Sequence, residues 1–330
     1  MTALRNRIGG VVATEAIPAL ILFAGLVVVA TWVNPRFLSS FNVSNVLTQV
    51  TPLALVAIGQ TFVVASRGLD LSVGSTVSLV AVIAASLFSP LGTVPALAIA
   101  VAAGLLVGVV NGLAVARGLE PFLVTLASLS IVQGIAFLIR ETPGGEVPDS
   151  ITGIAGYWGG TFPRALPLVL AVALVGAVLL GLTRAGRHLL AVGGDPEVAR
   201  LTGVRVERTL VWPYVLSAAC AALAAIFLVA RTRTGDPLVG ESLPLDSLTA
   251  VVLGGTALAG GRATILGSLT GALALGVLSN LLNFADVSDY WQTPVKGAIL
   301  VAAVLVPTLV AAAVRRRARA RAAASLGGSP

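Results

Sequence analysis

The sequence predicts an all-α polytopic membrane protein with about ten transmembrane helices. Only 11% of its 330 residues are charged, whereas soluble domains carry about 25%. Hydrophobic residues make up 57%, and the mean hydropathy is +0.99. The 46 residues between Asp70 and Arg117 contain no charge, although one spanning helix needs only about 20 apolar residues. These observations exclude a soluble enzyme and a secreted disulfide scaffold.

The apolar runs between charges place the spans in order along the chain. They predict helices over 16–34, 45–66, 71–88, 93–116, 121–139, 165–182, 209–230, 245–261, 263–284 and 295–314. The run 245–261 is short and rich in glycine, so we expect a broken or re-entrant helix there. Spans four and nine share a similar pattern of Gly, Asn and a following Pro, which is consistent with two inverted five-helix repeats.

The distribution of basic residues sets the orientation. With both termini inside, fifteen Lys and Arg residues face the cytoplasm and six face outward, as the positive-inside rule requires. We therefore expect a single permease domain over 1–314 and a basic, disordered cytoplasmic tail over 315–330. The net charge of +7 follows the ends and loops of the chain, so it does not indicate nucleic-acid binding.

Neither a metal site nor a catalytic group is expected. Cys220 is the only cysteine and lies in an apolar run, and His188 is the only histidine and lies in a basic loop. A metal or catalytic centre needs several such side chains together.

The inner loop 183–208 is much longer than the 2–8 residues that usually join helices in a bundle. Asp195 and Pro196 predict the N-cap and first turn of a short helix, and Gly203 predicts its end. Glu197 and Arg200 would lie on one flank. The candidate residues for docking to a partner are Asp195, Pro196, Glu197, Val198, Ala199, Arg200, Leu201 and Gly203. Alternatively, the helix lies on lipid headgroups.

Residues 66–74 predict a tight cytoplasmic turn. Gly68 would end the second helix, Asp70 or Ser72 would cap the third, and Gly74 would lie in its first turn.

Polar and flexible residues within the spans are candidates for the translocation pathway. They are Gln60, Asn111, Thr125, Ser130, Gln133, Gly254, Gly255, Asn280 and Asn283. For each polar residue, the alternative is a hydrogen bond between helices.

Four ordered motifs resemble those of ABC-transporter permeases of the ribose-type sugar-uptake family. They lie within residues 59–75, 121–134, 183–204 and 254–283, and the first contains Gly68-Leu69-Asp70-Leu71-Ser72-Val73-Gly74. The resemblance implies a permease of the bacterial cytoplasmic (inner) membrane that passes a ribose-, xylose- or galactose-like monosaccharide. It also implies a second permease copy or homologue, two cytoplasmic ABC ATPase domains, and an extracytoplasmic substrate-binding protein.

The chain has no phosphate-binding motif of its own and only one lysine, Lys296. We therefore expect no cofactor in this chain, with ATP and Mg bound by the partner ATPase.

Of two other classes of membrane protein, the first remains an alternative, whereas the second is disfavoured because the sequence lacks the clustered side chains that it needs. The first is an ion-gradient-driven secondary transporter or a passive channel for a small neutral solute. Ion coupling usually needs ionisable groups inside the spans, whereas Glu15, Asp70, Asp246 and Lys296 are all expected near helix ends. The other class is an intramembrane enzyme, which would need clustered acids, His or Cys.

Overall fold

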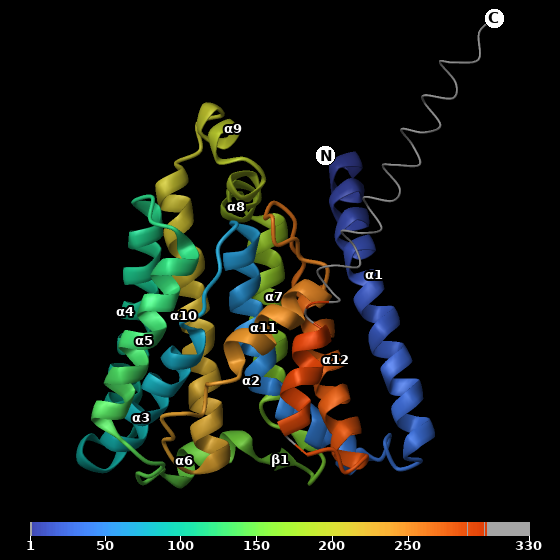
Figure 1. Ribbon diagram of the computed structural model, residues 1–330, viewed down its shortest axis with the longest axis vertical. Helices are drawn as coiled ribbons and strands as arrows, with labels where there is room; N and C mark the ends of the chain where they lie inside the picture. The colour runs from blue at the N-terminus through green and yellow to red at the C-terminus, as the bar shows by residue number, and fades with distance from the viewer. Residues whose placement is uncertain (1, 289, 300, 302–330) are drawn as a thin grey trace, which may run out of the picture.

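The computed structural model describes residues 2–288, 290–299 and 301, and it forms an all-α bundle with one small hairpin (Figure 1). The long helices are α1 (Thr2–Val33), α2 (Ser40–Ala65), α3 (Val73–Leu91), α4 (Thr93–Ala116), α5 (Pro121–Ile139), α7 (Leu166–Leu182), α10 (Val206–Thr232) and α12 (Ile265–Phe284). The shorter ones are α6 (Asp149–Thr152), α8 (Arg184–Gly194), α9 (Pro196–Leu201), α11 (Leu243–Leu253) and the 3₁₀ turn η1 (Gly153–Ala155). Residues 290–299 are also helical.

The expected all-α membrane architecture is confirmed. Seven described helices are long and apolar enough to span a membrane, and α7 with α8, bent by 68°, makes an eighth candidate. The expected break in 245–261 is present, because α11 has only 11 residues and a non-helical stretch follows it. At about 1.5 Å per residue, α11 covers roughly half of a bilayer core. Most of the expected span 295–314, and the tail 315–330, lie outside the described residues. The count of ten and the inverted repeat stay predictions.

Helix ends follow local sequence signals. The ranges 93–116 and 121–139 agree with α4 and α5. Glu120 accepts a hydrogen bond from Leu123 N, and Pro121 occupies the first turn of α5. Gly92, with a φ of 79°, makes the sharp turn between α3 and α4, a conformation that glycine adopts without strain.

The second helix forms the centre of the bundle. In α2, 89% of the spanning window is buried, compared with 72% in α3 and α10 and 17% in α1 and α5. The main neighbours of α10 are α2, α3 and α4, whereas α1 packs on α12. The outer helices therefore present apolar faces outward, as helices in contact with lipid do.

The bundle has two distinct ends, which we call the α9 end and the hairpin end (Figure 1). The α9 end carries α8 and α9. The hairpin end carries α6 and the antiparallel strands β1 (Tyr157–Trp158) and β2 (Phe162–Pro163), in which Tyr157 pairs with Pro163. Ser44 donates a hydrogen bond to the Thr161 carbonyl. The hairpin therefore covers the start of α2.

Candidate translocation and coupling sites

A non-helical segment, residues 66–72, leads from the α9 end into the interior of the bundle. Figure 1 shows the chain leaving α2 close to α8 and running back down to the start of α3. The expected tight turn at the surface is therefore wrong, because Asp70, Ser72 and Gly74 are buried, although Ser72 occupies the expected N-cap position of α3. The left-handed residue that follows α2 is Arg67, with a φ of 65°. Gly68 is required for space, since a Cβ there would lie 2.4 Å from the Tyr214 hydroxyl.

Asp70 is buried among hydroxyl groups. Its Oδ1 accepts from Ser72 N at 3.0 Å and Ser72 Oγ at 2.6 Å, and its Oδ2 accepts from Ser217 Oγ at 2.8 Å. Within the described part of the chain, no basic side chain pairs with it. Ser217 lies near the middle of α10, about 16 Å from the helix start at 1.5 Å per residue. The carboxyl group thus stands deep in the bundle, satisfied by hydrogen bonds alone.

The same network fastens the segment to the outer helices. Asn111 Nδ2 on α4 donates to Ser72 Oγ at 2.9 Å, and Ser128 on α5 donates to Asn111 Oδ1. Thr125 Oγ1 donates to the Leu69 carbonyl at 3.1 Å. Non-helical backbone at this depth needs such partners. Asn111 and Thr125, both candidates for the pathway, therefore bond between elements.

A second non-helical segment, residues 233–242, enters from the hairpin end. Arg233 ends α10 in the left-handed conformation, and Gly235 exchanges backbone hydrogen bonds with Gly144 at 2.8 and 3.1 Å. Gln133 Nε2 donates to the Pro237 carbonyl at 2.8 Å. Gln133 therefore fixes this segment to α5.

The second segment meets the first turn of α3 at a pair of glycines. A Cβ on Gly240 would lie 2.1 Å from the Gly74 carbonyl oxygen, and one on Gly74 would lie 2.4 Å from the Gly240 carbonyl oxygen. Only glycine permits this approach of two backbones. We call this contact the glycine crossing.

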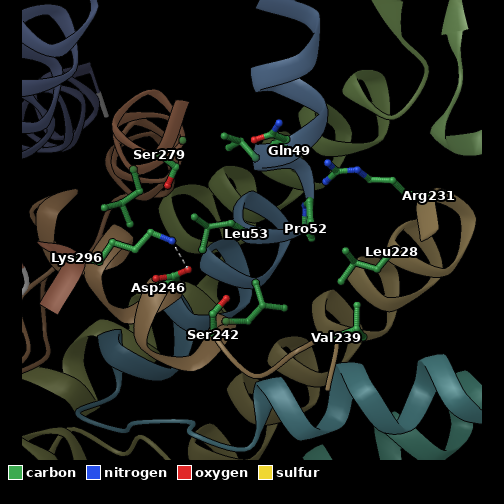
Figure 2. Close-up of a pocket in the computed structure, with 14 residues that line it drawn as sticks. Gln49, Pro52, Leu53, Leu228, Arg231, Val239, Ser242, Asp246, Ser279 and Lys296 are labelled. Carbon is green, nitrogen blue, oxygen red and sulfur yellow. Dashed lines mark hydrogen bonds and ion pairs between the residues drawn. The ribbon is translucent and has the colours of Figure 1, made fainter. Parts of the chain in front are cut away.

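A cavity of about 270 Å³ lies beside the crossing, between α2, α10, α11 and α12 (Figure 2). Lys296 Nζ bonds Asp246 Oδ2 at 3.0 Å in its wall. The lining residues are Gln49, Val50, Pro52, Leu53, Leu228, Arg231, Val239, Ser242, Leu243, Asp246, Leu275, Gly276, Ser279 and Lys296.

Sequence reasoning missed this cavity, because none of the nine candidate pathway residues lines it. The sequence did contain a signal for it, because Lys296, the only lysine, and Asp246 both lie at the ends of apolar runs. Ionisable groups near membrane spans usually have a function. The pairing of Lys296 with Asp246, across 50 residues of sequence, was not visible.

The remaining candidates are dispersed. Gln60 is fully buried, and neither of its side-chain polar atoms has a hydrogen-bond partner. Ser130 is exposed on α5 and bonds a carbonyl of its own helix. Asn280 and Asn42 exchange hydrogen bonds of 3.0 and 3.1 Å, and Asn283 accepts from Gln292 at 2.6 Å.

The two candidate glycines follow α11. A Cβ on Gly254 would lie 2.3 Å from the backbone of Gly267, and Gly255 has a φ of 87°. Both positions therefore require glycine, one for close packing and one for its backbone conformation.

The long inner loop contains two helices rather than one. The expected helix at 196–201 is confirmed as α9, with Asp195 Oδ1 accepting from Glu197 N at 2.9 Å and Val198 N at 3.1 Å. Gly203 follows it with a φ of 85°. The helix α8, which the sequence did not predict, begins where Thr183 Oγ1 accepts from Gly186 N.

The exposed surface of α9 is smaller than expected. Val198 and Leu201 are 56% and 87% exposed, but Ala199 is buried against Val192 and Val206. Ala199 is therefore a wrong choice for a docking contact, because it already packs within this chain. Arg200 bonds Glu197 at 3.0 Å and Glu207 at 2.9 Å, and the bond to Glu207 raises the pKa of the guanidinium.

One packed junction joins α8 to the end of α2 and to residues 254–264. Arg67 Nε donates to the Ala259 carbonyl at 2.8 Å, and its Nη2 donates to Gly194 O. Gly261 N donates to the Ala65 carbonyl at 3.0 Å. A Cβ on Gly193 would lie 1.8 Å from the Ala65 carbonyl oxygen. We call this contact the α2–α8 junction.

In the described part of the chain, no three His, Cys, Asp or Glu side chains gather as metal ligands would.

Comparison with known proteins gives consistent matches over most of the chain. The family model described as "Branched-chain amino acid transport system / permease component" matches residues 42–304. The ribose import permease protein of Bacillus subtilis is 38% identical over 300 residues, covering 87% of this chain and 91% of that protein. The ribose import permease protein of Escherichia coli K12 is 36% identical (87% and 92% covered), and the fructose import permease protein of Rhizobium meliloti is 35% identical (88% and 84%).

Proposed function

The chain belongs to the family of ABC-importer permease components described as the branched-chain amino acid transport system permease, and on this premise we propose that it imports a monosaccharide. Members of this family are membrane subunits without an ATPase site of their own. The proposed solute is ribose-, xylose- or galactose-like and is delivered by an extracytoplasmic binding protein. The proposed partners are a second permease copy or homologue and two cytoplasmic ATPase domains, which bind ATP and Mg.

The proposed orientation places the α9 end in the cytoplasm and the hairpin end outside. Both termini are then cytoplasmic in a multi-pass protein of the inner membrane. This assignment rests on the excess of arginine in the loops that lie at the α9 end, including Arg184, Arg187, Arg200 and Arg205.

The α2–α8 junction is the observation that supports coupling most directly. The exposed α9 follows α8, and α8 is fixed by Gly194 to Arg67, three residues before Asp70. A displacement of α9 by a nucleotide-driven partner is therefore passed through packed backbone to the segment 66–72. Leu201 and Val198 supply the small apolar contact that such docking needs.

The test compares Leu201→Asp and Arg200→Glu with Leu119→Asp. Leu119 is also an exposed leucine but lies outside α8 and α9, in the connection between α4 and α5. We expect all three variants to insert. The first two should lose the co-purifying ATPase or fail in ATP-dependent uptake, and Leu119→Asp should retain both. If Leu201→Asp and Arg200→Glu keep the ATPase bound and transport at the normal rate, this loop is not the coupling element.

The burial of Asp70 favours one competing function, ion-coupled transport, because acids deep in a bundle often carry protons. Reconstituted importer separates the two. ATP-driven import needs ATP and tolerates a protonophore, whereas a proton-coupled carrier needs no ATP and stops when the protonophore is added. Uptake would be measured with the binding protein over a panel of ribose, fructose, galactose and xylose.

A further inference from the structure

The cavity beside the glycine crossing has polar groups on two sides and apolar side chains between them. Figure 2 shows Lys296, Asp246 and Ser279 on one side of the view and Arg231 on the other, with Pro52 and Leu53 between them. The apolar contribution comes from Leu53, Leu228, Val239 and Leu275. Ligand sites characteristically have this mixture of apolar lining and a few fixed polar groups.

The polar groups of this cavity complement hydroxyl groups. Asp246 can only accept hydrogen bonds when ionised, Lys296 can only donate them, and the Gln49 amide does both. Each hydroxyl of a solute donates one bond and accepts others. The Asp246–Lys296 distance of 3.0 Å is one that neighbouring hydroxyls of a single ring can bridge.

Charge balance favours a neutral occupant beside the Asp246–Lys296 pair. Asp246 and Lys296 are 13% and 23% exposed and neutralise each other. The third charged residue of the lining, Arg231, is exposed and lies on the other side of the cavity. A neutral solute binds the pair without adding an uncompensated charge to a partly desolvated site, which would be costly. The volume of about 270 Å³ is just below the range of about 300–1,000 Å³ for small-molecule sites. It suits one small ring rather than an oligosaccharide.

We propose that this cavity is a solute site of the permease, and that it takes a single neutral polyhydroxylated ring whose hydroxyls bond Asp246, Lys296, Gln49 and Ser279. This inference rests on the proposed function, because it supplies that function with a place for the solute inside the chain. The proposed solute site therefore differs from the pathway residues predicted from the sequence, because it is formed by α2, α11, α12 and Lys296.

The chain provides its own probe, because Lys296 is its only lysine. Acetylation of the purified importer by an amine-reactive reagent is followed by mass spectrometry of the peptide that contains Lys296. The solutes are ribose, fructose, galactose and xylose, with gluconate as an acidic comparison. A bound solute should protect Lys296. At about ten times its dissociation constant it should slow acetylation about elevenfold, since the free fraction falls as 1 + [L]/Kd.

Matched variants separate solute binding from a purely structural ion pair. Ser279→Ala changes the cavity wall but not the pair, so it should weaken protection while leaving the rate without solute unchanged. Asp246→Asn should raise the rate without solute and remove protection. Ser89→Ala, at an exposed position of α3 outside the cavity lining, should match the wild type in both measurements.

Three results would overturn the inference. One is that a sugar taken up normally by the wild type leaves acetylation unchanged, which refutes the cavity but not the importer. Another is that Ser279→Ala retains full protection. A third is that gluconate protects Lys296 and the neutral sugars do not, which refutes the neutral class. Absence of ATP-dependent uptake for every sugar would instead count against the proposed function itself.

Discussion

The glycine crossing makes a sharp prediction about Gly240→Ala. The new Cβ would lie 2.1 Å from the Gly74 carbonyl oxygen, whereas ordinary contact begins near 3.4 Å. The backbones at Gly240 and Gly74 must therefore separate by about 1.3 Å. Both atoms belong to backbone-fixed positions, so neither can rotate away. The φ of Gly240 is not left-handed, so the cost of the substitution comes from the steric clash alone.

The magnitude follows from packing and one hydrogen bond. Overpacking costs about 1–3 kcal/mol, and a clash with backbone belongs at the upper end. The separation also stretches the Gly240 N to Ser78 Oγ bond of 3.2 Å, which contributes about 1 kcal/mol. We expect a loss of about 3 kcal/mol or more, or over a hundredfold in the folding equilibrium.

Thermal unfolding of the purified permease, together with uptake in cells, measures this effect. The control is Gly134→Ala, because a Cβ at Gly134 meets nothing within 4 Å and alanine is the better helix former by about 1 kcal/mol. The reasoning fails if Gly240→Ala unfolds at the same temperature as Gly134→Ala and transports normally.

Two further predictions concern conformation and topology. Gly255→Leu places a side chain at a φ of 87°, at a cost of about 1–2 kcal/mol, so uptake should be lost while membrane insertion stays intact. The control Gly25→Leu should transport, because a Cβ at Gly25 meets nothing within 4 Å. Normal uptake by Gly255→Leu contradicts the argument. A cysteine that replaces Asp149 should react with a membrane-impermeant reagent in intact cells, and a cysteine that replaces Leu201 should not. The native Cys220 is buried and should not react in either variant. The reverse labelling pattern would refute the proposed orientation.

Local signals predicted most of the helix boundaries. Glu120 and Pro121 define the start of α5, and Asp195 and Pro196 define the start of α9, because a cap acts on amides two or three residues away. The break after α11 was also visible, since Gly254 and Gly255 interrupt a run too short to span the membrane. In these cases the cause lies within a few residues of the effect.

The interior positions could not be predicted in this way. Asp70 was assigned to a surface turn because Ser217, which donates to it, and Asn111, which donates to its neighbour Ser72, are distant in sequence and carry no local signature. The cavity draws its wall from α2, α10, α11, α12 and the helical residues 290–299, and the Asp246–Lys296 pair exists only after those helices pack. Single-sequence patterns report amphipathicity and caps, but not which polar groups meet across a bundle.

The position of Asp70 also constrains the order in which the protein matures during synthesis. Ser217 follows Asp70 by 147 residues, so at about 5–20 residues per second the ribosome needs roughly 7–30 s to reach it. During that interval α10 does not exist, and one oxygen of the carboxylate lacks its native donor. The segment 66–72 can therefore adopt its native interior position only after α10 has been made. Completion of the Asp70 network therefore waits for α10, and a ribosome that stalls before α10 leaves a chain that cannot form the bond from Ser217.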